Sequence, residues 1–294
     1  GPTDVIKNQY DIVFVDESHR LKKRKNIMDY GNFDKCCSKL GFDPKTSNQL
    51  DWIIKRCKQR VLFYDATQSI KSADITPSEY EKSLGSEFKS KFMLKSQMRC
   101  IGGTDYINYV NEVFDLKNPE HKTFKDYELE TFNKASSVVS QIKQLERRHK
   151  LCRTVAGYSW EWKTKSIPLK DIKKDKLYDI DIDGNYYIWN TTDKNWILSE
   201  NAINEIGCVH TTQGYDLNYV GIIFGKEIDY DEKNNRFVVN LKEYYDVKVK
   251  SATPEEKVKE YIINAYKVMM MRGIKGCYLY ACNPGMQKFL KKYF

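Results

Sequence analysis

Short apolar runs alternate with helical periodicity through the first third of the chain. Residues 11–15 read Asp-Ile-Val-Phe-Val, a β-branched run typical of a strand buried on both faces of a parallel sheet. Residues 47–59 repeat apolar side chains at helical spacing, and residues 60–64 form a second apolar run. A Thr-Pro helix opening precedes residues 78–86, and a third strand is expected at 90–95. Strands separated by helices predict βαβ units around a parallel sheet.

The same alternation continues from about residue 105 to the end of the chain. Helical spacing begins near residue 105 and returns at 135–148 and 254–270. The expected strands in this part are 152–157, 206–210, 219–224 and 276–282. Aromatic residues around a Thr-Thr-Asp-Lys segment predict a hairpin insertion near 186–198. The simplest partition is two α/β domains, comprising residues 1–98 and 99–294.

Composition places the chain among folded proteins. Hydrophobic residues make up 41% of the 294 positions and aromatic residues 13%, which is enough to bury a core and excludes wholesale disorder. No run approaches the roughly 18 apolar residues of a membrane span, and the first residues carry no apolar signal-peptide region. The formal charge of +9 suits a nucleic-acid partner or an ordinary Lys-rich cytosolic protein. Its eight cysteines lack zinc-ligand spacing, so we expect reduced thiols and a cytoplasmic location.

The sharpest local feature is the segment Asp16-Glu17-Ser18-His19, which directly follows the first apolar run. Ligands of open α/β sheets bind at the carboxyl ends of the strands, and adjacent acids there are costly unless they serve a ligand. In nucleotide hydrolases one such acid holds Mg²⁺ and the next orients the attacking water. The alternative is a helix N-cap followed by a solvated turn. A strand before the acids and a histidine after them favour the functional interpretation.

Four further segments carry groups suited to phosphate chemistry, and each has an ordinary structural alternative. Gln68, after the second apolar run, can sense a terminal phosphate, although turns often contain Gln. Arg99 offers bidentate donors for phosphate oxygens, or a salt bridge between domains. Residues 210–216 read His-Thr-Thr-Gln-Gly-Tyr-Asp, in which Gly214 permits close backbone approach to a ligand or simply forms a turn. Arg272 follows a helix, as an arginine finger or as a complement to the helix dipole.

Taken in order, these five segments resemble motifs II to VI of superfamily 1 helicases. The closer likeness is to the Schlafen group 3-like DNA/RNA helicase domain family, over about residues 10–290. The sequence segments that carry this likeness are 16–21, 94–100, 156–162, 210–221 and 264–276. The resemblance implies an α/β architecture of two RecA-like parallel-sheet domains that bind ATP and Mg²⁺ between them and move single-stranded DNA or RNA, without a membrane.

The resemblance also implies residue roles. Asp16 would hold Mg²⁺, Glu17 would activate water, and Gln68 would read the γ-phosphate. Arg99 and Arg272 would approach the γ-phosphate from the second domain. On the motif V segment, Gly214 and Asp216 would lie toward the nucleotide. The residues expected against the nucleic-acid backbone in that segment are His210, Thr211, Thr212 and Gln213.

One family element is missing from the sequence. A phosphate-binding loop requires Gly-x-x-x-x-Gly-Lys-Ser/Thr, and the nearest approach, Gly221 to Lys226, has one residue too few between its glycines and a Glu in place of the hydroxyl. We therefore expect the first RecA-like domain to be N-terminally incomplete, through truncation or through natural loss, and the chain alone not to hydrolyse ATP. Met271 also departs from the family, which usually has a small hydroxyl residue there.

A basic run follows the Asp-Glu pair. Five of the six residues from Arg20 to Lys25 are basic, and we consider Arg20, Lys22 and Lys23 candidates for nucleic-acid contact or for a solvated loop. Trp160 is a candidate for stacking on a base or for packing in the core. The leading hypothesis is the core of an ATP-dependent helicase or translocase. The alternatives are a non-catalytic nucleic-acid-binding or regulatory module on the same fold, and an NTP-hydrolysing switch in defence against foreign nucleic acid.

Overall fold

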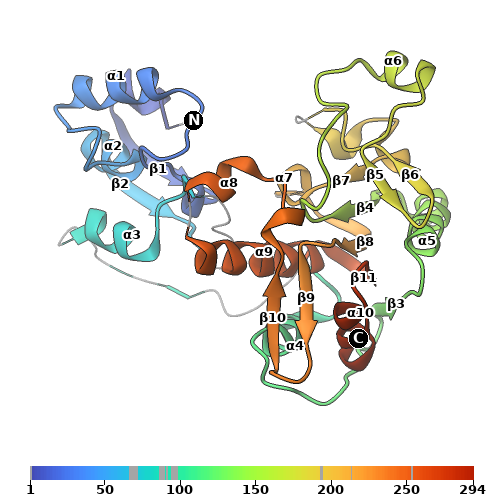
Figure 1. The fold of residues 1–294 in the computed structure, drawn as a ribbon. Coiled ribbons are helices and arrows are strands. Elements are labelled where there is room, and N and C mark those ends of the chain that lie inside the picture. The colour runs from blue at the N-terminus through green and yellow to red at the C-terminus, as the bar shows by residue number, and fades with distance from the viewer. Residues whose placement is uncertain are drawn as a thin grey trace. The chain divides into compact units, whose positions relative to one another are not determined.

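The computed structural model describes residues 2–65, 72–85, 90, 92–93, 99–192, 195–212, 214–252 and 254–294. The chain divides into two compact units (Figure 1). Unit 1 comprises Gly1–Met93 with Ser251–Pro254, and unit 2 comprises Leu94–Lys250 with Glu255–Phe294. Both units mix helices with parallel strands, so the predicted α/β class is confirmed. Whether both units are RecA-like domains stays a prediction.

Unit 1 is built on a two-stranded parallel sheet in which Phe14 lies opposite Val61. Two of its helices begin with capping boxes, formed by Asn48 with Asp51 and by Thr76 with Glu79, which satisfy the first free amides. The bounds of its strands and helices are β1 Tyr10–Val15, α1 Tyr30–Leu40, α2 Gln49–Arg56, β2 Cys57–Leu62 and α3 Pro77–Leu84, with 3-10 turns at Asp4–Ile6 and Ser18–Arg20.

The sheet of unit 1 is covered on one face only. Val13, Val15 and Leu62 pack against the core formed with the helices. On the opposite face the apolar side chains stay open to solvent, namely Ile12 (49% exposed), Phe14 (66%), Val61 (39%) and Phe63 (45%). The prediction that residues 11–15 form a strand buried on both faces is therefore wrong. The run is apolar on both faces, but no described element covers the second one.

Unit 2 is built around a five-stranded sheet in the order β3-β11-β8-β4-β7, with every neighbouring pair parallel. This arrangement is consistent with a RecA-like fold. The strands of the sheet are β3 Glu128–Thr131, β4 Cys152–Ala156, β7 Ile206–Gly207, β8 Leu217–Phe224 and β11 Gly273–Ala281. The helices are α4 Gly103–Phe114, α5 Ala135–His149, α6 Leu169–Lys174, α7 Val209–Thr212, α8 Val247–Ala252, α9 Glu255–Met270 and α10 Pro284–Tyr293.

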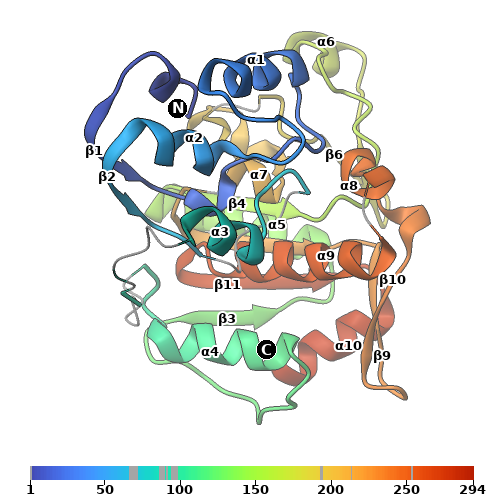
Figure 2. The same ribbon diagram turned by 90° about the vertical axis from the view of Figure 1, so that its left-hand side faces the viewer.

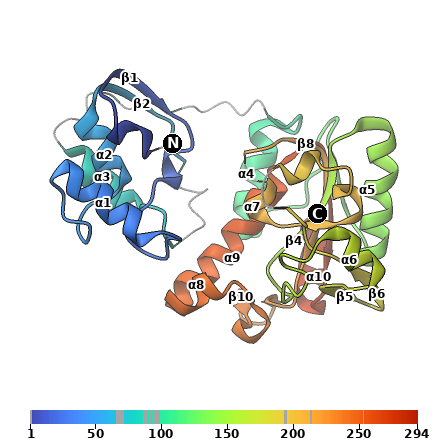
Figure 3. The ribbon, with the colours of Figure 1, turned by 90° about the horizontal axis from the view of Figure 1, so that it is seen from above.

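Alternate residues of β8 face different helices. Gly221 lies so close to α5 that a Cβ there would meet Val138 and Ile142, whereas Phe224 stacks on Tyr266 of α9 at 4.0 Å between ring centroids. Figure 2 shows α9 running alongside β11, and in Figure 3 α5 and α9 lie on opposite sides of β8. The central strand is thus buried on both faces, as its uninterrupted apolar sequence predicts.

Several predicted elements are displaced or missing. The hairpin lies at β5 Ile180–Ile182 and β6 Asn185–Tyr187, so its prediction at 186–198 is wrong, and Trp196–Leu198 forms a 3-10 turn. The predicted strand 206–210 ends at Gly207, where α7 takes over. Residues 91 and 94–95 of the expected strand 90–95 lie outside the described part of the chain. A second hairpin, β9 Ile228–Asp231 with β10 Arg236–Val239, has no counterpart among the predicted elements.

The thiol and membrane expectations concern the whole chain. All eight cysteines are free, and seven of them are buried. Across the described residues, no helix combines the length and the apolarity that a bilayer crossing requires.

Candidate functional site

The turn after β1 is fixed to the end of β2. The backbone amide of Ser18 donates to the carbonyl oxygen of Phe63 at 2.8 Å, and the Ser18 hydroxyl donates to the same oxygen at 2.7 Å. Glu17 adopts a left-handed conformation (φ 52°), which costs a non-glycine residue of the order of 1 kcal/mol and persists only where neighbours hold it. Because β1 and β2 are parallel neighbours, Asp16 and Glu17 follow β1 at the same side of the sheet as Asp65, which follows β2. The predicted position of Asp16 and Glu17 after a strand agrees with this arrangement.

A buried histidine holds the Glu17 carboxylate. His19 is 1% exposed, and its Nε2 lies 3.0 Å from Oε2 of Glu17. The amide of Asp65 donates to Nδ1 of His19 at 3.4 Å, so the two ring nitrogens of His19 face the segment after β2 and the Glu17 carboxylate respectively. His19 thus links the Glu17 carboxylate to the segment after β2. This positioning role is not apparent from the sequence, where the histidine is only a motif member.

Asp16 is exposed and has one oxygen committed. Its Oδ1 accepts from the Glu17 amide at 2.9 Å. Within the described residues, no group of three or more His, Cys, Asp or Glu side chains is arranged to hold a metal ion. A single carboxylate suits Mg²⁺, which keeps several waters and takes its remaining ligands from phosphates. The residues therefore fit a magnesium ion that arrives with a nucleotide, and they do not form a stand-alone metal centre.

In unit 2, three segments that are far apart in sequence converge at one edge of the sheet, the edge formed by the amino-terminal ends of the central strands β8 and β11. Asp216 and Arg272 directly precede the first residues of the neighbouring strands β8 and β11, and the Leu217 amide donates to the Arg272 carbonyl oxygen at 2.9 Å. The Ile101 amide donates to the Ile274 carbonyl oxygen at 2.8 Å, which brings the Arg99 segment to the same edge. Sequence reasoning predicts that these segments share a function, and the structure brings them together.

The side chains at this edge are already engaged. Nε of Arg99 lies 2.5 Å from Oδ1 of Asp216, and both side chains are partly exposed, at 39% and 45%. Two residues predicted to serve the nucleotide are therefore paired with each other. The Arg272 side chain is 1% exposed, so this structure does not present it to solvent as a finger. The predicted phosphate roles of both arginines stay predictions.

The motif V segment departs from the expected nucleic-acid contacts. Thr211 and Thr212 are buried, and their hydroxyls donate to the carbonyl oxygen of Cys208. They close the first turn after β7, so both hydroxyls are engaged within the protein, and their predicted contact with the nucleic-acid backbone stays a prediction. His210 is half-buried, with its ring 5.7 Å from that of Tyr158. Gly214 has a φ of 89°, the left-handed conformation for which glycine is suited.

Other predicted contacts are used within the units. Lys22 pairs with Asp74, and Lys23 lies 2.8 Å from Glu79, whereas Arg20 forms no ion pair with another described residue. Trp160 is 8% exposed and belongs to the core cluster of unit 2, so packing prevails over base stacking. Gln68 and Gln213 lie outside the residues that the structure describes.

The near miss for a phosphate loop does not fit a phosphate. Gly221 lies inside β8, and Cβ atoms built on Gly221 and Gly225 would collide with Val138 and with the Glu227 carboxylate respectively. The space beside both glycines is filled by protein, and the nearest polar group is an acid. The segment from Gly221 to Lys226 therefore forms no cradle for phosphates, and the predicted magnesium and water roles of Asp16 and Glu17 stay predictions.

Comparisons with known proteins show which family the sequence belongs to. The chain is 24% identical to the uncharacterized protein YPL245W of Saccharomyces cerevisiae over 330 aligned positions, which cover 98% of this chain and 67% of the yeast protein. The family described as Schlafen group 3, DNA/RNA helicase domain, matches residues 3–283. With acids at the strand ends of unit 1 and three converging motif segments in unit 2, the chain belongs to the Schlafen group 3 DNA/RNA helicase domain family.

Proposed function

We propose that this chain forms the core of an ATP-dependent helicase or translocase that acts on single-stranded DNA or RNA. The observation that carries the proposal is the convergence of the Arg99, Asp216 and Arg272 segments at one edge of the unit 2 sheet. Distant segments that meet at one point are expected where a single ligand must be contacted by all of them. Membership in a helicase-domain family supports a nucleic-acid partner.

Two residues of unit 1, Asp16 and Glu17, would take part in ATP hydrolysis. Asp16 would bind the magnesium ion, which neutralises charge on phosphate oxygens when it is present. Glu17 would orient the attacking water and accept its proton, and the buried ring of His19, whose Nε2 lies 3.0 Å from the Glu17 carboxylate, would hold that carboxylate in place. Glu17 has a left-handed backbone conformation, and non-glycine residues in this conformation cluster at functional sites, which supports a functional role for Glu17.

Without a phosphate-binding loop, we expect the chain to bind nucleic acid but not to hydrolyse ATP. The 294 residues contain no Gly-x-x-x-x-Gly-Lys-Ser/Thr segment. We expect the purified chain to bind single strands in a salt-dependent way and not to hydrolyse ATP. A measurable ATPase of this chain that depends on Glu17 would contradict the second expectation.

The motor hypothesis is tested in a form of the protein that also carries a phosphate loop. We expect strand-stimulated hydrolysis there, and Glu17→Gln should abolish it while ATP binding persists. Glu81→Gln, an exposed carboxyl of α3 in the same unit, is the matched control and should keep full activity. Turnover that survives Glu17→Gln would remove the proposed role of Glu17.

The rival functions give different outcomes in the same assays. Hydrolysis that is stimulated by a strand but separates no duplex would identify a translocase or a switch. Strand binding without hydrolysis, even beside an intact phosphate loop, would identify a non-catalytic module. The engaged Arg99–Asp216 pair favours this module as the second candidate, because an arginine already paired with an acid is less available to a phosphate.

A further inference from the structure

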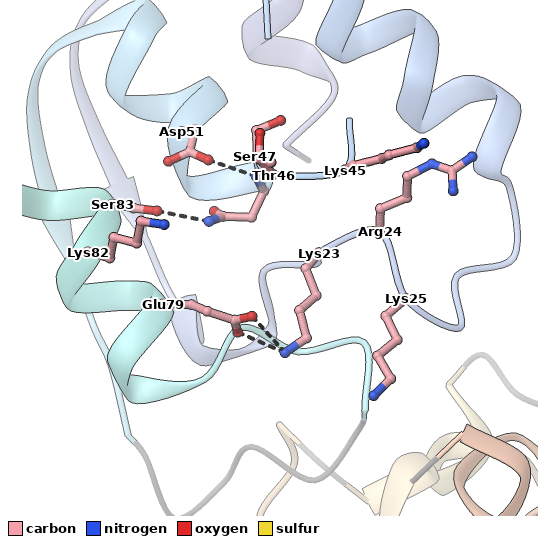
Figure 4. A pocket seen from close by; sticks show the side chains of 11 residues that line it. Lys23, Arg24, Lys25, Lys45, Thr46, Ser47, Asp51, Glu79, Lys82 and Ser83 are labelled. Atoms are coloured by element: carbon pink, nitrogen blue, oxygen red, sulfur yellow. Dashed lines mark hydrogen bonds and ion pairs between the residues drawn. The ribbon is translucent and has the colours of Figure 1, made fainter. Parts of the chain in front are cut away.

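A polar pocket of about 580 Å³ lies within unit 1, and its lining does not include the acids that follow β1. Three segments line it: the loop of residues 23–25, the turn and first helical residues at 45–48 and 51, and helix α3 at residues 79, 82 and 83. Figure 4 shows these segments around the opening, with Lys82 on one side and Lys45 and Lys25 on the other. The basic run of residues 20–25 supplies one of these segments, and no motif of the sequence marks the other two.

The lining carries more positive charge than its acids neutralise. Five of the lining residues are cationic and two are acidic. Lys23 is paired with Glu79 at 2.8 Å, and Nε of Arg24 is 2.7 Å from Asp34. The three remaining cations, Lys25, Lys45 and Lys82, are exposed and form no ion pair with any described residue.

The two acids of the lining are occupied by structural bonds. Glu79 accepts from the Lys23 ammonium and from the amide and hydroxyl of Thr76. Burial raises the pKa of Glu79, but the hydrogen bonds from Lys23 and Thr76 outweigh it, so the pKa of this carboxyl is lowered. Asp51 accepts from the Asn48 amide at 2.7 Å. The charge of Glu79 is thus neutralised by Lys23, and only Asp51 remains against the three unpaired lysines, so the lining keeps an excess of positive charge.

The walls of the pocket are tied together without a ligand. Lys23 and Asn48 form a β-bridge, and the Gln49 amide donates to the Lys22 carbonyl oxygen at 2.9 Å. The Asn48 side-chain amide donates to the Ser83 hydroxyl at 2.8 Å, which joins α2 to α3. A pocket whose backbone walls are fixed in advance has only its lysine side chains left to order when a ligand binds.

We propose that this pocket binds consecutive phosphates of a single nucleic-acid strand. The proposal rests on the proposed function for the nature of the partner, and on the pocket for the place. The unpaired ammonium groups come from three separate segments and do not converge on one point (Figure 4). Such a distribution matches a row of phosphates better than one small anion, which needs donors that meet. Lysine ammonium groups act there as point charges without base preference.

The test compares two triple variants with the same change in net charge, from +9 to +6. The pocket variant carries Lys25→Gln, Lys45→Gln and Lys82→Gln. The control carries the same substitution at Lys7, Lys35 and Lys55, which are exposed in the same unit and do not line the pocket. Fluorescence anisotropy measures the binding of labelled single strands of RNA and DNA, each about 12 nucleotides long, between about 50 and 300 mM salt, a range that spans physiological ionic strength.

The pocket variant loses three phosphate contacts. The negative slope of log K against log salt should therefore become less steep by about 2, and binding should weaken about 100-fold at about 0.1 M salt. The control should keep most of the wild-type slope. Equal loss in both variants would assign binding to diffuse charge and overturn the pocket, while strand binding itself would stand.

A second titration decides the case in which the wild-type chain binds no strand. Inorganic tripolyphosphate is added to the wild type and both variants, and the thermal unfolding midpoint is followed. A rise in midpoint that only the pocket variant lacks would assign the pocket to soluble phosphates and refute the strand assignment. No rise in any of the three chains would refute a phosphate pocket altogether.

Discussion

The buried carboxyl of Glu227 should make the stability of unit 2 depend on pH. Glu227 is 0% exposed at the end of β8, and its Oε1 accepts from the Tyr266 hydroxyl at 2.5 Å. Burial raises the pKa of Glu227 from 4.5 to about 7, against the smaller opposing effect of the Tyr266 hydrogen bond. The folded protein therefore holds this proton more tightly than the unfolded chain does.

The sign and size of the effect follow from linkage. The contribution of Glu227 to stability is fully present below pH 4.5 and is lost as the pH rises through about 7. A rise of this extent corresponds to about 3 kcal/mol between the two limits. Glu227→Gln stays neutral throughout, and its carbonyl oxygen can still accept from Tyr266. We expect the variant to lose this pH dependence and to be more stable than the wild type at pH 8, by up to about 3 kcal/mol.

Urea unfolding between pH 5 and pH 8, followed by tryptophan fluorescence, measures the effect because unit 2 contains four of the five tryptophans. Glu130→Gln, an exposed carboxyl on β3, is the matched control and should retain the wild-type profile. If Glu227→Gln loses as much unfolding free energy between pH 6 and pH 8 as the wild type, Glu227 is not the group responsible.

Three further predictions concern unit 2. Glu205→Ala removes the acceptor of four hydrogen bonds, one from the buried indole of Trp196, and should cost about 3–5 kcal/mol in urea unfolding; a loss below about 1 kcal/mol would contradict it. Gly207→Ala places a Cβ 2.3 Å from the buried Trp196 ring and should cost about 1–3 kcal/mol in the same assay; an unchanged unfolding free energy would contradict this prediction. Asp216→Asn releases Arg99 from an exposed ion pair worth up to about 1 kcal/mol. The variant should therefore bind tripolyphosphate up to about five-fold more tightly than the wild type. An unchanged affinity would argue against a phosphate role of Arg99.

The sequence predicts the buried strands of unit 2 well and the edges poorly. The run 219–224 is apolar at nearly every position because β8 is covered by helices on both faces, and a short apolar run of this kind is typical of a strand at the centre of a parallel sheet. Strand β3 reads Glu-Leu-Glu-Thr at the sheet edge, where solvent replaces one neighbour and the apolar signal disappears. At the hairpin, the turn is Asp183-Gly184 with positive φ at both residues, a strong local signal outweighed in our prediction by the aromatic cluster after it.

The site was predictable where a local rule applies. Asp16 and Glu17 are found from their place after a strand, since parallel strands end at a ligand-binding edge. The engagement of Lys22 and Lys23 with acids more than 50 positions away follows from tertiary contacts, which a basic run does not reveal. The pocket lysine Lys82 lies in a segment with no motif, and only the folded chain brings it into the same pocket as Lys25.

The uncovered face of the unit 1 sheet has a consequence for handling the protein. Two strands present Phe14 and Phe63 to water beside Ile12 and Val61, and a flat apolar strand surface is a template for association between molecules. At high protein concentration or in sulfate, which strengthens apolar burial, we expect the purified chain to self-associate through this face. Polar replacements at Phe14 and Phe63 are then the changes most suited to improving solubility, because neither side chain contributes to the buried core of its unit.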